Sequence, residues 1–334
     1  MKRFGGKDDE LQRIRDNLKN LQNKEVRDAA IETLKVTIST LDMVNKFVLD
    51  QADENVLSWL LANKSQNNHN KARGKRQAST GEWFVQSNEF TRWINSPKSS
   101  LWLYGKAGSG KTILCSTTIE HVLEKSRSCA DFHCAYFYFD FQTKWTVDDM
   151  LRSVIAQLCR SKGQLPLPLH HLSQECRGAG KQPSTSSLIE ILLPLVNSFN
   201  RTVVILDALD ECGAESERVD LLETLGGLIK DSKVLSLFVT SRKERDIERR
   251  LEPIFDAIIG LEENVIQSDI DLYVRSMLDK DVDLQKWDEP TKCEIERTLV
   301  NGADGMYPPI LVFFDKIQVS MGRMSDNSIE RLLG

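Results

Sequence analysis

Short, almost entirely apolar runs alternate with longer segments of mixed polarity through the middle of the chain. A strand that is buried on both faces is apolar at nearly every position. The longer segments repeat their apolar residues every three or four positions, as amphipathic helices do. This alternation predicts a parallel sheet covered by helices, which is an α/β fold. The predicted strands are Leu101–Tyr104, Ala135–Phe141, Val203–Leu206, Leu235–Val239 and Ala257–Leu261.

The N-terminal region carries a helical pattern of its own. Leu11, Ile14, Leu18 and Leu21 recur at spacings of three and four, and a similar stripe resumes over residues 34–48. This pattern predicts one or two amphipathic helices. They pack either on their own chain or, as a coiled coil or stalk, on a partner, and the pattern alone leaves both interpretations open.

The remaining segments complete the predicted domain organisation. Residues 63–80 are polar, with almost nothing apolar to bury, which predicts a connecting loop. Its basic residues are interpreted as solvated rather than as an anion-binding patch or a nuclear-localisation signal. After residue 262 only helical patterns occur, which predicts a small C-terminal appendage. The predicted parts are an N-terminal helical segment (1–62), a linker and lead-in (63–99), the α/β core (100–262) and a C-terminal helical segment (263–334).

Composition narrows the class of protein. Hydrophobic residues make up 40% of the 334 residues and charged residues 28%, which is typical of globular domains. The net charge of −5 gives no basic footprint, so we expect no nucleic-acid partner. No apolar run of about 18 residues is present and the first residues are charged, so we expect neither a membrane span nor a signal peptide. Seven cysteines without a C-x-x-C pair suit reduced thiols, and we expect a cytoplasmic protein.

One glycine-rich segment follows the first predicted strand and precedes a helical pattern. It matches G-x-x-x-x-G-K-[ST], the Walker A motif or phosphate loop, in which backbone N–H groups and a helix N-terminus surround phosphates. We expect Lys111 to neutralise the β and γ phosphates and the Thr112 hydroxyl to bind Mg²⁺. The alternative, a glycine-rich turn with a surface lysine, is disfavoured by the flanking strand and helix. The predicted nucleotide contacts are Gly105, Lys106, Ala107, Gly108, Ser109, Gly110, Lys111, Thr112 and Ile113.

A second motif, of the Walker B kind, is the apolar strand Val203–Leu206 followed by Asp207, Asp210 and Glu211. A buried strand delivers Asp207 to the carboxyl edge of the sheet, beside the phosphate loop. We therefore expect Asp207 to bind Mg²⁺, directly or through water. A carboxylate in the following loop is expected to orient the water that attacks the γ-phosphate, with Glu211 the first candidate and Asp210 the second.

Arg242 follows the next strand and should lie on the same edge of the sheet. We expect it to sense the γ-phosphate through a bidentate contact, the alternative being a helix-capping or surface arginine. Three later arginines are interpreted as a solvated helix face, although one of them could act in trans within an oligomer. They are Arg245, Arg249 and Arg250.

Two groups of metal-ligating residue types are interpreted as structural. Cys129, His133 and Cys134 offer only three ligands and run into a core strand, which disfavours a zinc site. His170 and His171 follow two prolines without a spacing that implies catalysis, and we expect them in a loop.

The chain resembles the NACHT branch of the signal-transducing P-loop ATPases (the STAND class), in particular the fungal Nod-like receptors, in the segments GKAGSGKT, VVILDALDEC and LFVTSR. The lead-in from Thr80 to Phe84, followed by Phe90 and Trp93, is also similar, as is the stretch from Asn301 to Met306. The small residue Ala208 before the paired acids resembles the NACHT form of the second motif.

This resemblance implies a molecular switch that is closed with a diphosphate and open and oligomeric with a triphosphate. In fungi such switches are coupled to self/non-self recognition and regulated cell death. The resemblance favours ATP over GTP, and no guanine-reading N-K-x-D motif is visible. It also implies self-association and a partner protein for the N-terminal helices. The sequence stops at Gly334, before a winged-helix unit or sensor repeats, so we expect a fragment or a short relative of such receptors.

Two other functions stay open on the sequence. One is a steadily turning-over ATPase or a small-molecule kinase, although a kinase does not need the adjacent acids Asp210 and Glu211. The other is a non-catalytic interaction module, in which the N-terminal helices recruit a partner and the nucleotide only stabilises the fold.

Overall fold

The computed structural model describes residues 12–17, 51–60, 66–75, 80–129, 132–261, 263–280, 284–302, 306–307 and 314. The chain divides into two compact units, Met1–Leu57 and Ser58–Gly334, and the second unit contains the sheet. Of the predicted N-terminal helices, residues 12–17 and 51–60 are described, and both stretches are helical. The rest of that pattern lies outside the described residues.

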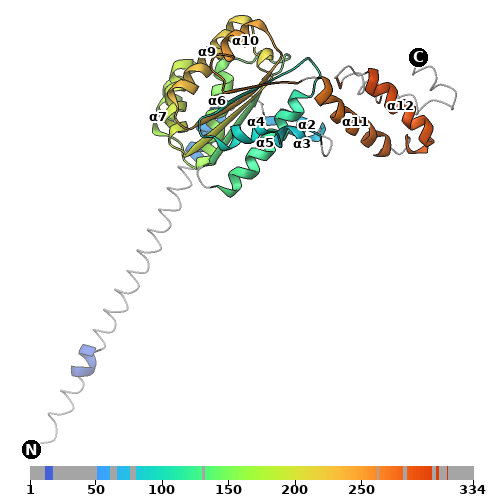
Figure 1. Ribbon diagram of the computed structural model, residues 1–334. Helices are drawn as coiled ribbons and strands as arrows, with labels where there is room; N and C mark the ends of the chain where they lie inside the picture. Colours follow the sequence, from blue (N-terminus) through green and yellow to red (C-terminus); the bar gives the residue numbers. More distant parts are fainter. Residues whose placement is uncertain are drawn as a thin grey trace, which may run out of the picture. The chain divides into compact units, whose positions relative to one another are not determined.

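Five parallel strands form one sheet in the order β2-β3-β4-β1-β5 (Figure 1). The predicted α/β fold and all five predicted strands are confirmed. The strand boundaries differ from the predicted ones, most clearly in β2, which spans Phe132–Tyr138, whereas the predicted run was Ala135–Phe141. The strand stops because the Asp140 carboxylate accepts the N–H groups of Gln142 and Thr143 and closes a turn. The strands are β1 Ser100–Tyr104, β2 Phe132–Tyr138, β3 Arg201–Asp207, β4 Leu235–Ser241 and β5 Ala257–Gly260.

Helices cover both faces of the sheet (Figure 1). On one face α5 packs on β2, β3 and β4 and is flanked by α2 and α3, while α4 contacts β1. On the other face α6, α8 and α9 pack on β2, β3 and β4, and α7 and α10 pack on α8 and α9. These helices are α2 Gln66–Lys75, α3 Glu82–Val85, α4 Asn88–Asn95, α5 Lys111–Ser128, α6 Val147–Lys162, α7 Leu167–Ala179, α8 Thr185–Asn197, α9 Glu215–Asp231 and α10 Arg245–Leu251.

Helix α2 replaces the connecting loop that the polar composition predicted. Two of its residues, His69 and Ala72, are each only 5% exposed, and the helix packs against α5 and β2. These residues are three positions apart and therefore lie on one face of the helix. Because so few of its side chains are buried, α2 has no apolar residues at helical spacing. Its polar sequence therefore predicts a loop.

His170 and His171 were also expected in a loop, and they lie in α7. The preceding prolines do not prevent this helix because they occupy its first positions, with Pro166 as the N-cap. Proline is tolerated there, since the first N–H groups of a helix have no partner within the helix.

The lead-in before β1 belongs to the core. Phe84, Phe90 and Trp93 are at most 2% exposed and form an aromatic cluster with Phe238 of β4. The indole N–H of Trp93 also donates to the carbonyl of Leu237, 3.1 Å away. The lead-in is therefore anchored on β4, the strand that pairs with β1 beside the phosphate loop.

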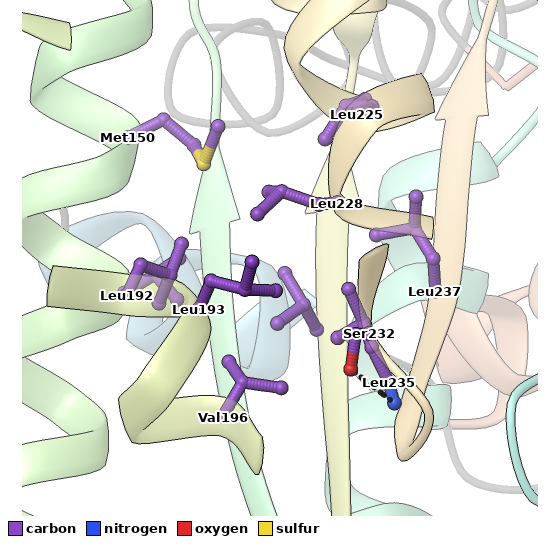
Figure 2. A pocket seen from close by; sticks show the side chains of 11 residues that line it. Met150, Leu192, Leu193, Val196, Leu225, Leu228, Ser232, Leu235 and Leu237 are labelled. Carbon is purple, nitrogen blue, oxygen red and sulfur yellow. Dashed lines mark hydrogen bonds between the residues drawn. The ribbon is translucent and has the colours of Figure 1, made fainter. Parts of the chain in front are cut away.

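The opposite face contains a small hollow between α6, α8 and α9 (Figure 2). Its lining is apolar apart from Ser232, whose hydroxyl donates to the side chain of Asn197. Such a lining offers nothing to bind a phosphate, and we interpret the hollow as part of the hydrophobic core.

The predicted C-terminal appendage contains α11 Glu263–Lys280, the short η2 Leu284–Lys286 and α12 Glu289–Gly302. The carboxylate of Asp269 on α11 ties it to the lead-in, since it accepts the N–H of Gly81 (3.0 Å) and the indole N–H of Trp83 (2.9 Å). Within the part of the chain that the structure describes, none of the helices is long and apolar enough to cross a bilayer.

Candidate functional site

The glycine-rich segment forms a tight loop between β1 and α5. Gly108 and Gly110 have φ angles of 74° and 84°, in the left-handed region that glycine adopts without strain. A Cβ on Gly105 would lie 2.7 Å from Oγ of Ser109 and 3.0 Å from Cβ of Leu261. The loop thus requires glycine at these three positions, and it leads into the N-terminus of an 18-residue helix, where an anion is stabilised.

Lys111 folds back over this loop. Its Nζ donates to the carbonyl oxygens of Gly105 (2.8 Å) and Lys106 (2.7 Å). Burial lowers the pKa of Lys111, while the negative charges of Asp210 and Asp207 act in the opposite direction. The ammonium therefore lies in the field of the acids at the end of β3, and its expected contact with phosphates stays a prediction.

Asp207 ends β3 and is 2% exposed. Its Oδ1 accepts the hydroxyl proton of Thr240 at 2.6 Å, and the hydroxyl of Thr112 also hydrogen-bonds to this carboxylate. Thr240 in turn accepts the N–H of Ala208 at 2.9 Å. Burial raises the pKa of Asp207, and the hydrogen bonds and Lys111 oppose this effect.

Oxygen atoms from Thr112 and Asp207 thus meet beside the Lys111 ammonium. Hydroxyl and carboxylate oxygens suit Mg²⁺, which commonly takes one or two protein ligands together with waters and substrate phosphates. Among the described residues, no group of three or more His, Cys, Asp or Glu side chains is arranged to hold a metal ion. A metal here would therefore be shared with a phosphate. That Cys129, His133 and Cys134 do not form a metal site stays a prediction.

We predict opposite effects of Asp207→Asn on stability and on metal binding. Because burial raises the folded-state pKa of Asp207 above 3.8, stability is lost as pH rises from 3.8 through that pKa. Asparagine does not titrate, so without Mg²⁺ the variant should melt higher than the wild type at pH 7, and the gap should shrink towards pH 4. With Mg²⁺ and nucleotide the order should reverse. Melting temperatures against pH, with and without Mg²⁺, check this prediction, and an equal loss of stability under all conditions would contradict it.

Asp210 is engaged by Arg242. The side chain of Asp210 is 4% exposed, and its two oxygens accept Nε–H of Arg242 (2.6 Å) and the backbone N–H of the same residue (2.8 Å). The hydrogen bond and charge of Asp210 raise the pKa of Arg242. This clamp suits Asp210 to positioning the arginine at the edge of the site. That Arg242 senses a γ-phosphate, and that Asp210 orients water, remain predictions.

Glu211 lies in the short helix η1 Leu209–Glu211. Its Oε2 accepts the backbone N–H of Phe141 at 3.1 Å, from the loop that follows β2. Burial raises the pKa of Glu211, and the neighbouring charge of Asp210 adds to this effect. A carboxylate of raised pKa is a better proton acceptor. That Glu211, rather than the Arg242-bound Asp210, orients the attacking water stays a prediction.

The structure adds neighbours that the sequence did not reveal. Cys115, one turn after Thr112 on α5, is fully buried and its thiol interacts with the Asp207 carboxylate. Tyr307 lies over the phosphate loop: its N–H donates to the carbonyl of Gly108 at 3.0 Å, and a Cβ on Gly110 would be 3.1 Å from its ring. Of these neighbours, only Cys115 could have been found from the sequence, because a spacing of three residues from Thr112 places both side chains on one face of the helix.

The strand order and the loop define a P-loop NTPase fold. The first strand leads through the phosphate loop into a helix, and β4 lies between β1 and β3, so that the loop and Asp207 flank the end of β4. Ligands of open parallel sheets bind at such carboxyl edges.

Residues 79–242, which are 164 of the 334 residues, match the model of the family described as Nephrocystin 3, N-terminal. The search of curated proteins gave no match.

Several solved structures are similar at low identity. The Aeropyrum pernix ORC2 protein, solved as ADPNP–ADP complexes, is 16% identical over 73% of this chain and 64% of its own, with a TM-score of 0.47. A Walker-type ATPase of Pyrococcus abyssi is 14% identical over 77% and 72%, with a TM-score of 0.48. The Aeropyrum pernix ORC1 protein, solved in complex with DNA, is 13% identical over 81% and 64%, with a TM-score of 0.38. The present chain thus spans less than two thirds of both ORC proteins, and its lack of a nucleic-acid partner stays a prediction.

Proposed function

We propose that this protein is a nucleotide-dependent molecular switch that binds Mg-ATP at the phosphate loop and hydrolyses it slowly. The observation that carries the proposal is the convergence of the Lys111 ammonium with the oxygens of Thr112 and Asp207 at one edge of the sheet. In this proposal the phosphate loop residues hold the polyphosphate and Lys111 neutralises it. Thr112 and Asp207 hold Mg²⁺, which would shield the phosphate charges.

The engagement of Asp210 with Arg242 supports slow hydrolysis. Both oxygens of Asp210 accept hydrogen bonds from Arg242, whereas Glu211 accepts the N–H of Phe141 with only one of its two oxygens. Asp210 must therefore release Arg242 before it can orient a water molecule, while Glu211 keeps a free oxygen for this role. Arg242 would then reach the γ-phosphate when Asp210 releases it, which links hydrolysis to a change of conformation.

The finer assignment rests on resemblance. The three motifs are similar to the NACHT branch of the STAND class, which implies a cytoplasmic signalling protein of the kind that acts in innate-immunity-like responses or regulated cell death. It also implies ATP rather than GTP, and self-association or partner binding through the predicted N-terminal helices over residues 1–62.

The proposal is tested by nucleotide content, turnover and molecular mass. We expect the purified protein to retain an adenine nucleotide and to release phosphate slowly in both single-turnover and steady-state assays. We also expect its mass, measured by light scattering, to differ between diphosphate and a non-hydrolysable triphosphate analogue. Rapid sustained phosphate release would point instead to a constitutive ATPase. An identical mass and identical partner binding in all nucleotide states would point to an interaction module.

A further inference from the structure

A buried polar contact connects helix α2 to the strand beside the candidate metal site. Nδ1 of His69 lies 3.0 Å from the hydroxyl of Tyr138, the last residue of β2, and Nε2 lies 3.0 Å from Oε1 of Glu120 on α5. His69 is 5% and Tyr138 2% exposed, and the imidazole packs against the ring of Tyr136, with centroids 4.9 Å apart. His69 of α2 therefore connects α5 and β2.

Each ring nitrogen of His69 has one hydrogen-bond partner, so the imidazole is held from both sides. The donor and acceptor roles in the Tyr138 bond depend on the tautomer and charge of the ring, but in every form Nδ1 and the hydroxyl share one proton. The hydroxyl of Tyr138 is thereby held in place by a partner 69 residues away in the sequence.

Tyr138 is the direct neighbour of Asp207. The two residues are paired in the parallel register of β2 and β3, so their side chains lie side by side on the α5 face of the sheet. The thiol of Cys115 completes the contact, since it interacts with both the Tyr138 hydroxyl and the Asp207 carboxylate. Tyr138 and Cys115 are thus buried neighbours of Asp207.

We propose that His69 is a positioning residue for the metal site, which acts through Tyr138 and Cys115 to hold the Asp207 carboxylate in place for Mg²⁺. This inference rests on the proposed function, because it assumes that Asp207 binds the metal. Metal ligands require their supporting groups to be fixed within a fraction of an ångström. Helix α2 would therefore support the nucleotide site through His69. A displacement of α2 would lower the affinity for Mg²⁺ without changing the phosphate loop.

The test is a comparison of ATP-analogue affinity in Mg²⁺ and in EDTA for the full chain. Mg²⁺ should raise the affinity of the wild type for the ATP analogue, and we expect His69→Ala and Tyr138→Phe each to reduce this gain by about threefold to tenfold. This loss is smaller than the largest losses of metal affinity caused by mutating groups that directly support a metal ligand. Affinity in EDTA should stay within about twofold. Because both substitutions break the same link, the double variant should lose no more than either single variant.

Arg73→Ala is the matched control. Arg73 lies on the same helix and its Nε is 3.9 Å from the same Glu120 oxygen, but its side chain is 65% exposed. This variant should keep the full gain from Mg²⁺. An unchanged gain in Tyr138→Phe, or equal losses in Mg²⁺ and EDTA, would overturn the inference while leaving the proposed function intact. A wild type that gains nothing from Mg²⁺ would instead overturn the metal site itself, and the inference with it.

Discussion

Replacing Glu211 by glutamine is expected to lower the rate of phosphate release by about 10²- to 10³-fold and to leave the affinity for Mg-ATP within about threefold. Glutamine keeps the size of the side chain and can still accept the N–H of Phe141. It cannot accept a proton from the attacking water. Single-turnover hydrolysis with saturating protein separates this effect from binding, because every ATP molecule is bound at the start.

The pH dependence gives a second readout for Glu211. Burial and the nearby Asp210 raise the pKa of Glu211 above its ordinary 4.5. The wild-type rate should therefore rise with pH as this carboxylate ionises and level off above its pKa, whereas Glu211→Gln should lack this rise. Glu215→Gln, at the exposed start of α9, is the control and should hydrolyse at the wild-type rate. Wild-type hydrolysis by Glu211→Gln would shift the role to Asp210 or to another group.

Replacing Lys111 by alanine should weaken nucleotide binding by about 100-fold or more, which corresponds to roughly 3 kcal/mol. The variant loses the ammonium that faces the phosphates and the acids after β3. Because burial of this ammonium already lowers its pKa, the nucleotide-free variant should melt no lower than the wild type. Calorimetric titration with ATP measures the affinity, and thermal unfolding checks the fold.

Lys230→Ala, at the exposed end of α9, removes the same charge far from the phosphate loop in sequence and should bind ATP like the wild type. If Lys111→Ala binds as tightly as Lys230→Ala, the phosphate loop does not hold the nucleotide. If it also keeps mass and partner binding unchanged, the nucleotide does not regulate assembly.

The sheet could be predicted because its central strands β1, β3 and β4 are buried on both faces and so leave nearly continuous apolar runs. Helix α2 could not be predicted, because it packs on the core through His69 and Ala72 and its other residues are polar. The end of β2 was misplaced for a different reason: Phe141 extends the apolar run, yet its side chain is 78% exposed because it lies in the turn that Asp140 closes.

The candidate site also has features that one segment of sequence encodes and features that depend on contacts between segments. The positions of Lys111 and Asp207 could be predicted, because a strand, a glycine-rich loop and a helix place Lys111 and a buried strand places Asp207. The pairing of Asp210 with Arg242 and the neighbourhood of Tyr138 depend on the register between strands. No pattern within one segment encodes that register.

The most direct test of the account is the position of Mn²⁺, in place of Mg²⁺, bound with a non-hydrolysable ATP analogue and located by its anomalous scattering. We expect one metal that contacts the Thr112 hydroxyl, a phosphate oxygen and Asp207, the last directly or through one water. The Lys111 ammonium should contact the same phosphates. A nucleotide that lies away from Lys111, or a metal that shares no phosphate with the Asp207 side of the site, would contradict it.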